Sequence, residues 1–210
     1  LKTAEMGYDG KGQYIITNNK DLPDIGRFPS HGMIMEGFVD FEREISVIAA
    51  RGADGKVVCF PPGENVHHKG ILDTTTVPAN ISDATAIKAK DIAQNIARKL
   101  DVIGLLAVEF FVLKDGSLLV NELAPRPHNS GHWTMDGCAT SQFEQFIRAI
   151  CGMELGLVNM ITKTKMKNLI GSEIEKAKQI ERDNKNARVH VYGKKEIRDG
   201  RKMGHVNYIE

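Results

Sequence analysis

The sequence predicts an α+β fold, in which hairpins and helices are mixed along one chain. Two Asp-Gly pairs, Asp54-Gly55 and Asp115-Gly116, each stand between two apolar runs, which is a strong signal for a β-hairpin. Residues 82–100 carry apolar side chains at steps of three and four, the spacing of one helix face. Strands and helices do not alternate in a βαβ rhythm, so the pattern favours α+β over a parallel sheet.

The remaining elements follow from local pattern and turn residues. Ser82 is the expected N-cap of the 82–100 helix, and a second helix is expected at 141–150. A further helical segment is expected near 174–183. The apolar face of the first helix is Ala86, Ala89, Ala93, Ile96, Ala97 and Leu100. Strands are expected at 13–17, 33–35, 45–50, 57–60, 105–113, 117–123, 157–161, 187–192 and 204–209.

Composition places the chain among ordinary globular proteins. It has 210 residues, 41% of them hydrophobic and 26% charged, with a net charge of +1. Near-neutral charge argues against a nucleic-acid coat or a membrane-surface binder, and the apolar runs are shorter than the ~20 residues that span a bilayer. The opening residues do not resemble a signal peptide, and the three cysteines are expected to be free thiols in a reducing cytoplasm. The chain does not begin with Met, and we expect it to be a fragment.

The most informative feature is a pair of acidic residues in the hairpin around Asp115-Gly116. A two-residue turn there places Glu109 directly opposite Glu122. Two carboxylates facing each other on paired strands are destabilising, and a divalent cation between them removes that penalty. A longer turn with a shifted register, or a solvent-facing glutamate, is the alternative. The otherwise apolar strands favour a Mg²⁺ site shared with phosphates.

Three polar segments could bind anions. Residues 7–13, Gly-Tyr-Asp-Gly-Lys-Gly-Gln, have glycines whose backbone amides can approach phosphate, although glycine clusters more often only make turns. Residues 126–133 form a loop dense in polar side chains, including Arg126, His128, Asn129 and Ser130. The spacing of His128 and His132 suits zinc on a helix, but the prolines and Gly131 argue against a helix there. Residues 190–205 cluster cations around one turn, either a phosphate clamp or a solvated basic hairpin.

One further segment could hold a nucleoside. Glu36-Gly37-Phe38-Val39, followed by Glu44, offers a strand end and a carboxylate for adenine and ribose hydroxyls. By itself this pattern has almost no specificity.

Taken together, these segments resemble the 5-(carboxyamino)imidazole ribonucleotide synthases, ATP-grasp ligases of purine biosynthesis. The matching residues are Lys2-Thr3, residues 7–13, 36–39, 65–67, 121–126, 128–133 and 200–205, in family order and over almost the whole chain. The resemblance implies a partial ATP-grasp fold with three parts: a small-lobe remainder at 1–37, the large lobe at 38–154, and a β-rich C-terminal domain at 155–210. It also implies carboxylation of 5-aminoimidazole ribonucleotide through carboxyphosphate, with ATP, Mg²⁺ and bicarbonate.

The resemblance also assigns roles by position. Lys2 and residues 6–13 would contact the ATP phosphates, namely Met6, Gly7, Tyr8, Asp9, Gly10, Lys11, Gly12 and Gln13. Glu36, Gly37, Phe38 and Val39 would hold adenine, Glu44 the ribose, and His67 would lie at the nucleotide site. Glu109 and Glu122, with Asn121 beside them, would hold Mg²⁺. The ribonucleotide and bicarbonate pocket would be lined by Tyr8, Asp9, Lys11, Arg126, His128, Asn129, Lys194 and Arg201.

Other expectations follow from the same resemblance. It implies a cytoplasmic homodimer that passes its product to a mutase, with no nucleic-acid or membrane partner. Family members carry an N-terminal domain and an ATP-contacting lysine ahead of this sequence, so we expect weak or no catalysis from these residues alone. Residues 21–30 are short for the helix usual before Met33, and Asp199 replaces a frequent proline with little expected effect. The rival readings are another ATP-grasp carboxylase or ligase and a catalytically inactive nucleotide-binding fragment.

Overall fold

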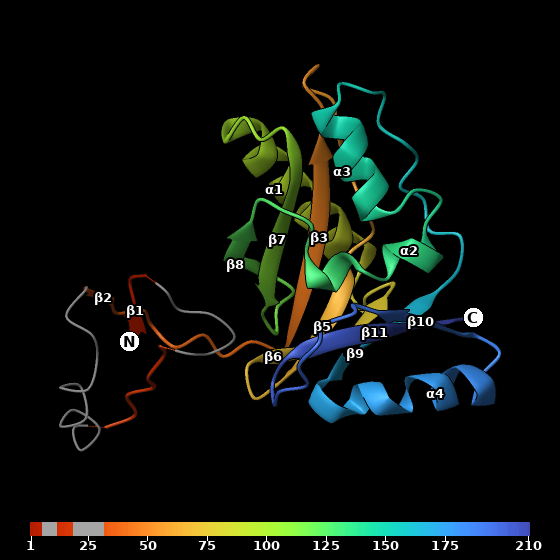
Figure 1. Cartoon of the computed structure of the whole chain (residues 1–210). Coiled ribbons are helices and arrows are strands. Elements are labelled where there is room, and N and C mark those ends of the chain that lie inside the picture. Colours follow the sequence, from red (N-terminus) through yellow and green to blue (C-terminus); the bar gives the residue numbers. More distant parts are fainter. Residues whose placement is uncertain (6–11, 19–31) are drawn as a thin grey trace. The chain divides into compact units, whose positions relative to one another are not determined.

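The computed structural model describes residues 1–5, 12–18 and 32–210 (Figure 1). The chain divides into two compact units. Unit 1 comprises Leu1–Asp40 with His67–Ile71, and unit 2 comprises Phe41–Val66 with Leu72–Glu210. Each unit is described by itself.

Unit 2 is built on one large sheet, which confirms the α+β prediction. Its strands are β3 (Arg43–Arg51), β4 (Val57–Cys59), β5 (Gly63–His68), β6 (Ile71–Val77), β7 (Gly104–Val112), β8 (Leu118–Ala124), β9 (Thr164–Ile170), β10 (Ala187–Val191) and β11 (Lys202–Ile209). They lie in the order β10-β11-β9-β6-β5-β3-β7-β8, with β4 also pairing with β3. The β3–β4 and β7–β8 hairpins are the two that the Asp-Gly pairs predict.

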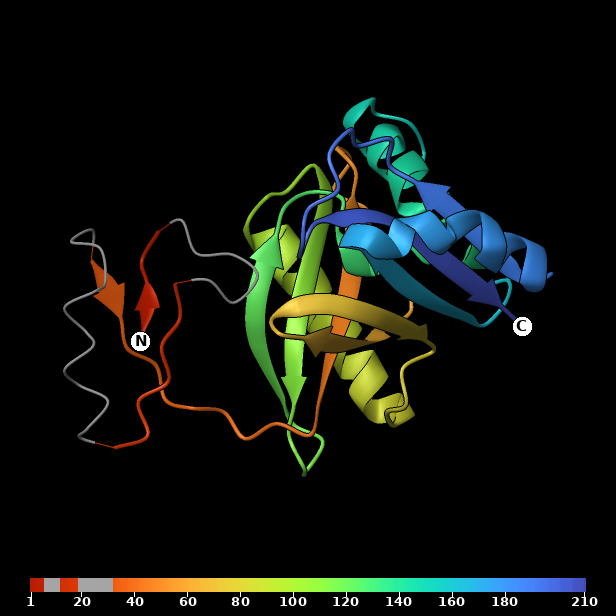
Figure 2. The same cartoon turned by 60° about the horizontal axis from the view of Figure 1, so that its bottom comes forward.

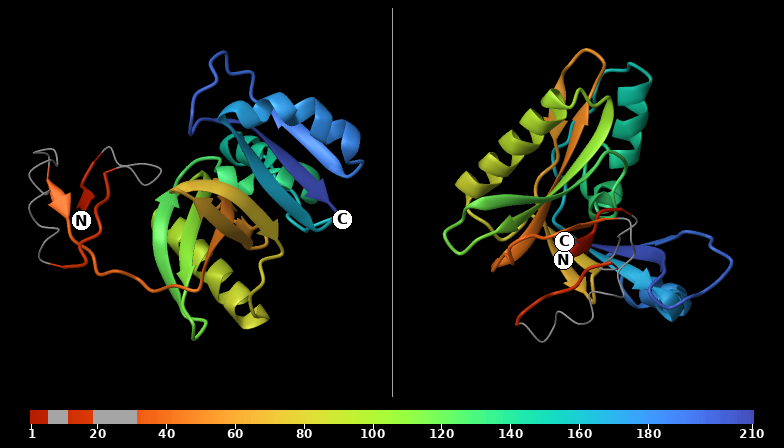
Figure 3. Two further views of the ribbon diagram at one scale, coloured as in Figure 1. Left: turned by 90° about the horizontal axis from the view of Figure 1, so that it is seen from below. Right: turned by 90° about the vertical axis from the view of Figure 1, so that its left-hand side faces the viewer.

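Alternating side chains along β3 enter two different cores. Ile45, Val47 and Ala49 pack with the buried alanines of α1 (Asp83–Lys99), which begins after the predicted N-cap Ser82. Ile48 and Ala50 face the other side, where they pack with Phe60 and Trp133. Figure 3 shows α1 and α3 (Gln142–Ile150) on opposite faces of the strands. The period of two in a strand therefore explains why the sheet is covered on both sides.

The C-terminal part of the chain extends the same sheet. β9 pairs antiparallel with β6 through Thr74 and Lys167, and β11 then pairs with β9. A 3₁₀ helix, η3 (Gly171–Lys176), leads into α4 (Ala177–Asp183), which packs its Ala177 on Leu169 and Val206 of β9 and β11. Figure 2 shows α4 lying along these strands. The C-terminal hairpin is thus tied to the large sheet by backbone hydrogen bonds.

Unit 1 contains a small two-stranded sheet. β1 (Lys2–Thr3) pairs antiparallel with β2 (Met33–Ile34). The strand predicted at 13–17 is wrong, because Gln13 forms only an isolated bridge with Lys2 and residues 14–17 are not in a strand. A local apolar pattern without a long partner strand does not make a ladder.

Two further expectations were wrong, and three strands were missed. Residues 157–161 are not a strand, because only Met160 forms a bridge, to Cys138 beside the short helix α2 (Thr134–Gly137). Leu100 is exposed rather than part of the apolar helix face, since it is the C-cap of α1. Strands β5, β6 and β9 were not predicted. Their polar and charged residues, such as those of Thr164–Ile170, hide the apolar alternation.

A cluster of three histidines lies where the C-terminal hairpin meets α2. The His205 ring stacks on the His190 ring, with centroids 4.6 Å apart, and lies tilted against the His132 ring at 4.9 Å. Tyr192 Oη lies 2.9 Å from His205 Nδ1, and Asp136 Oδ2 lies 2.8 Å from His190 Nε2. Burial, together with the neighbouring histidines, lowers the pKa of His205 to about 3. Burial, His190 and Lys202 lower the pKa of His132 to about 4.

These two lowered pKa values predict a fold that loses stability in mild acid. Both folded-state values lie below the ordinary 6.5, so their contribution is complete above pH 6.5 and is lost as the pH falls toward 4. Each histidine can add up to about 1.4 kcal/mol per pH unit to the slope. Urea unfolding between pH 7 and about pH 5 measures it.

The control is His205→Gln, which removes one titrating ring from the cluster. Its unfolding free energy should fall less steeply with acid than that of the parent chain. Equal slopes would contradict the assignment, as would an NMR titration in which His205 of the parent protonates near pH 6.5. The titration in the parent keeps the test valid if the variant does not fold.

Candidate functional site

The two acidic residues of the β7–β8 hairpin face each other as predicted, but not for the predicted reason. Glu109 pairs with Glu122, whereas Phe110 pairs with Val120, so the register shifts between them. The turn is longer than two residues, because Leu113 N–H donates to the Ser117 carbonyl. Asn121 is the extra residue of a β-bulge, and this bulge offsets the longer turn.

The two glutamates project from one face of the sheet, since directly opposed residues of an antiparallel pair share a face. Alternation along β7 places that face opposite α1, because Val108 and Phe110 belong to the α1 core. The Glu109 side chain is 13% exposed, and Glu122 is exposed. The pair therefore lies at the open edge of the face that Trp133 covers.

The donor chemistry of this pair fits a hard divalent cation. The two carboxylates and the side-chain carbonyl of the bulged Asn121 offer oxygen ligands, which Mg²⁺ prefers. Among the described residues no group of three His, Cys, Asp or Glu side chains is arranged to hold a metal. Mg²⁺ is usually bound by one or two carboxylates when phosphates supply its other ligands.

The loop after β8 brings His128 to the acidic pair. His128 Nε2 lies 3.7 Å from Glu109 Oε1, and His128 Nδ1 lies 2.8 Å from Ser130 Oγ. The next residue, Asn129, opens a 3₁₀ turn, η2 (Asn129–Gly131). Arg126 is exposed, and its guanidinium donates to the neighbouring Pro127 carbonyl. This loop therefore presents an imidazole, an amide and a guanidinium within a few residues of one another.

Asn129 is held by an amide on the C-terminal strand β9. Asn129 and Asn168 exchange two hydrogen bonds, of 2.7 and 2.8 Å, and Asn168 also donates to the Leu72 carbonyl. Only an NH₂ group can face that carbonyl, so the Leu72 contact fixes which way the Asn168 amide points. The Asn129 amide is oriented in turn.

Cations gather on the turn between β10 and β11. Lys194 Nζ lies 5.6 Å from the centre of the Tyr192 ring and donates to the Lys202 carbonyl. Partial burial and the charges of Arg201 and Lys202 lower the pKa of Lys194, as expected where cations crowd together. Arg201 donates to the Glu196 carbonyl, and Arg198 pairs with the Glu196 carboxylate. Lys194 and Arg201 thus form a concentration of positive charge on an exposed turn.

The histidine cluster connects this turn to the loop that carries His128. The His132 ring meets Tyr192 edge-on at 6.0 Å, and Tyr192 lies under Lys194. Unit 2 therefore contains one continuous series of contacts. It runs from Glu122 and Glu109 to His128, passes through the Gln142 side chain to His132, and continues to Tyr192 and Lys194.

The residues expected to bind nucleotide fall mostly in unit 1. Met6, Gly7, Tyr8, Asp9, Gly10 and Lys11 lie outside the described residues. Lys2 forms an ion pair with Glu36 at 2.5 Å. Gly12 has φ +74°, and a Cβ at this position would lie 2.5 Å from the Thr3 hydroxyl oxygen. Phe38 is 79% exposed, Val39 is half-buried and Gly37 has open space around it. His67 is half-buried, and Glu44 of unit 2 pairs with Asn65 and Phe111 in the sheet.

Sequence reasoning missed the buried side chains that hold the loop. Asn168 and Gln142 are fully buried, and Asp136 accepts from Asn207 and lies against His190. Gln142 stands one residue after the N-cap Ser141, where an amide normally faces solvent, so no local pattern marks it. Asn168 does have a local signal, because it is a polar residue directly before Leu169 in a strand that also contains Met166.

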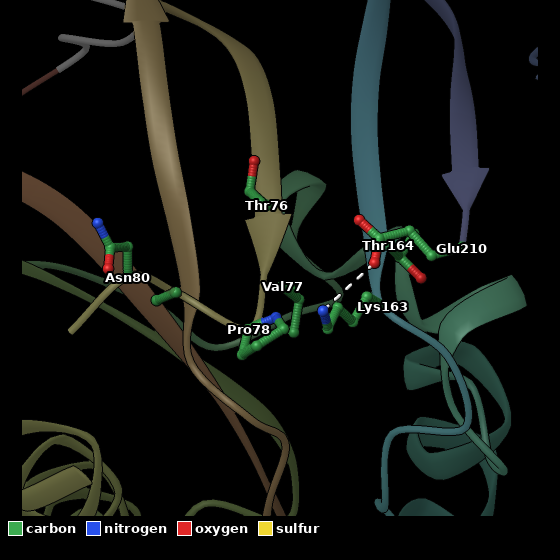
Figure 4. Close-up of a pocket in the computed structure, with 8 residues that line it drawn as sticks. Thr76, Val77, Pro78, Asn80, Lys163, Thr164 and Glu210 are labelled. Carbon is green, nitrogen blue, oxygen red and sulfur yellow. Dashed lines mark ion pairs between the residues drawn. The ribbon is translucent and has the colours of Figure 1, made fainter. Parts of the chain in front are cut away.

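A separate pocket lies at the C-terminal end of β6 (Figure 4). It is lined by Thr76, Val77, Pro78, Ala79, Asn80, Lys163, Thr164 and Glu210. Lys163 and Glu210 form an ion pair of 3.4 Å across it. None of the residues predicted for the site lines this pocket.

Comparison with known proteins gives this arrangement a family. The sequence profile of the ATP-grasp domain matches residues 1–143. The chain belongs to the ATP-grasp family. Residues 164–210 match a second profile, the phosphoribosylaminoimidazole carboxylase C-terminal domain. The fold of this chain is therefore the ATP-grasp fold, followed by a segment that contains β9 to β11.

Individual relatives are consistent with the two profile matches. The chain is 52% identical to N5-carboxyaminoimidazole ribonucleotide synthase of Brucella melitensis, covering 100% of this chain and 59% of that protein. An ADP complex of an N5-carboxyaminoimidazole ribonucleotide synthetase superposes with a TM-score of 0.95 at 43% identity, over 100% of this chain and 56% of that one. The Aspergillus clavatus enzyme with ADP and 5-aminoimidazole ribonucleotide gives 0.79 at 34%, over 82% and 48%. The chain thus spans about half the length of these relatives.

Neutralising one of the two opposed carboxylates should stabilise the fold when no divalent cation is present. Glu122→Gln removes the repulsion between directly opposed charges, which is worth about 0.2–1 kcal/mol. Unfolding in the presence of EDTA measures this gain. Glu181→Gln, an exposed glutamate on α4, is the control and should change little.

Mg²⁺ with ADP should reverse the order of stability of the parent chain and Glu122→Gln. The parent chain should gain thermal stability from Mg²⁺ and ADP together, and Glu122→Gln should gain less, because one ligand has lost its charge. If Mg²⁺ and ADP stabilise both proteins equally, the acidic pair does not hold the metal.

Proposed function

We propose that the polypeptide containing this chain is a ligase that carboxylates the exocyclic amine of 5-aminoimidazole ribonucleotide. In this reaction a bicarbonate oxygen attacks the γ-phosphorus of ATP, and ADP leaves. The amine then attacks the carbonyl carbon of carboxyphosphate, phosphate leaves, and the amine gives up a proton. The product is N5-carboxyaminoimidazole ribonucleotide.

The observation that carries this proposal is the continuous series of contacts in unit 2. An acidic pair suited to a metal and phosphates lies 3.7 Å from His128, and His132 and Tyr192 lead to the Lys194 cations. Carboxylates at one end and cations at the other suit a reaction between a nucleoside triphosphate and a substrate with its own phosphate. The matching C-terminal profile supports the same substrate.

The loop residues have the chemistry to hold bicarbonate. Arg126 and the Asn129 amide can donate to its oxygens, and His128 next to Glu109 can hold or move a proton. Lys194 and Arg201 would bind the 5′-phosphate of the ribonucleotide. Tyr8, Asp9 and Lys11 stay predictions for the same pocket.

The nucleotide roles rest on the resemblance and on family membership. Glu109 and Glu122, with Asn121, would hold Mg²⁺, which when bound offsets the negative charge of the phosphates. Lys2 and residues 6–13 are proposed for the phosphates, Glu36–Val39 for adenine, and Glu44 and His67 for the rest of the nucleotide. The boundaries at 37 and 154, the cytoplasmic location and the transfer of product to a mutase stay predictions. None of the helices in the part that the structure describes could cross a membrane.

Two other functions are alternatives. Another ATP-grasp carboxylase or ligase would use the same acidic pair with a different acceptor. A fragment that only binds nucleotide would bind ATP without turnover that depends on the ribonucleotide.

The test is ADP release with ATP, Mg²⁺ and bicarbonate, with and without 5-aminoimidazole ribonucleotide. It is made on the natural polypeptide that contains these residues. We expect strong stimulation by the ribonucleotide. ATP binding without stimulation would favour the alternatives.

Arg201→Ala sharpens this test. Loss of a phosphate contact should raise the KM for the ribonucleotide about tenfold or more and leave the KM for ATP within about twofold. Arg182→Ala on α4 is the matched control and should change neither value. An equal rise in both Michaelis constants would argue against a phosphate contact.

We also propose that the protein forms the homodimer that the resemblance implies, through the outer face of α3. Phe143, Ile147 and Ile150 lie on one stripe of this helix and are 38%, 52% and 48% exposed, while Gln142 and Gln145 face inward. Contiguous exposed apolar side chains of this kind mark association surfaces.

Ile147→Glu tests the surface. A charge in the middle of an apolar interface should weaken association at least about tenfold, measured by analytical ultracentrifugation over a concentration series. Ile87→Glu on α1 is the control, because Ile87 is 59% exposed but lies on another helix. A monomeric parent, or equal behaviour of the two variants, would contradict the proposal.

A further inference from the structure

Gln142, the first residue of α3, forms side-chain hydrogen bonds to the loop that carries His128. Its side chain is fully buried. The Gln142 Oε1 accepts from the His128 backbone N–H at 3.0 Å, and its Nε2 donates to the His128 carbonyl at 2.8 Å. One side-chain amide therefore satisfies both backbone polar groups of a single loop residue.

The same amide reaches the other end of the loop. Gln142 Nε2 lies 2.9 Å from His132 Nδ1. The Gln142 carbonyl oxygen already accepts from the His128 N–H, so the atom beside His132 is the amide nitrogen. The second N–H of this nitrogen donates, and His132 Nδ1 is the acceptor. This arrangement requires a neutral His132 ring, in agreement with the low pKa that burial gives it.

The loop is fitted closely around this side chain. A Cβ on Gly131 would lie 2.6 Å from Gln142 Oε1, so no larger residue fits there without displacing the amide. Thr134 adds a second link, because its hydroxyl donates to the Gly131 carbonyl at 2.6 Å and accepts from the Gln142 backbone N–H at 2.9 Å. The path of residues 128–134 is thus set from α3.

We propose that Gln142 is a positioning residue for the bicarbonate and ribonucleotide pocket. It fixes His128 at its distance from Glu109 and sets the starting point of Asn129, without itself contacting substrate. The kinetic part of this inference rests on the proposed function, because that function gives His128 and Asn129 their roles.

The chain contains a matched control on the same helix. Gln145 is also fully buried, and it makes the same two-bond grip on a backbone, donating to the Gly156 carbonyl at 2.7 Å and accepting from the Gly156 N–H at 2.8 Å. The loop around Gly156 carries none of the candidate site residues. Gln142→Met and Gln145→Met therefore each remove the two bonds to one backbone residue at equal burial, and Gln142→Met also removes the bond to His132.

The kinetic test compares the two variants in the natural polypeptide that contains the chain. Gln142→Met should lower kcat/KM for the ribonucleotide at least about tenfold while the KM for ATP changes less than about twofold. Gln145→Met should lower the unfolding temperature similarly and leave both constants near the parent values. Equal kinetic effects in the two variants would show a structural role only and would overturn the proposal.

An NMR measurement on the histidine rings tests the positioning without any substrate. In the parent at about pH 6 to 7, His132 should be neutral with its proton on Nε2. Gln142→Met should change the ring signals of His132 and His128, whereas Gln145→Met should not. Unchanged signals in Gln142→Met would overturn the inference. A different outcome combines the two tests: the Gln142→Met signals change, but the ribonucleotide does not stimulate the parent. In that case the proposed function has failed while the positioning stands.

Discussion

The candidate site depends on one constraint, which is that an irregular loop packed against the sheet must find partners for its backbone polar groups. Residues 128–134 follow β8 without strand or long helix, and Ser130, Gly131, Trp133 and Thr134 are buried. A buried group left without a partner costs about 1–3 kcal/mol. Side chains from α3 and β9 meet this need, which is why α3 turns its glutamines inward and leaves isoleucines exposed. The apolar cores hold the sheet, but buried amides define the path of the functional loop.

The β-bulge at Asn121 solves a second geometric problem. A strand that carries apolar residues on one face and an acidic residue on the other has a fixed alternation. The longer turn at residues 114–116 would place Glu109 out of register with Glu122, and the extra residue restores the pairing. Bulges of this kind commonly lie beside functional sites, because they redirect one side chain without changing the rest of the sheet. The opposed carboxylates are therefore a built feature and not a consequence of a simple hairpin.

The sequence reveals those parts of the structure whose cause is local. Ser82 and the spacing behind it are sufficient for α1, and the Asp-Gly pairs are sufficient for both hairpins. The sequence does not reveal β9, because Lys165 and Lys167 alternate with residues that are buried only once β6 and β11 lie on either side. For the same reason Asn168 and Gln142 could not be found, since their partners lie far away in the sequence. The pairing of Glu109 with Glu122 was predicted from a two-residue turn that does not exist, and two departures from that turn cancel.

The C-terminal segment contributes to the site through the sheet and not through a flexible attachment. Because β9 pairs with β6 along Thr74–Val77, the strands that carry the acidic pair and the cations belong to one hydrogen-bonded sheet. Asn168 on β9 donates to Asn129, and the His205 ring on the adjacent strand β11 lies against the His132 ring. A substitution of Asn168 or His205 would alter the conformation of the loop, even though neither residue lies in the ATP-grasp segment. The position of the loop is therefore decided jointly by the two segments, which makes the C-terminal part of the chain necessary for the geometry of the site as well as for its positive charge.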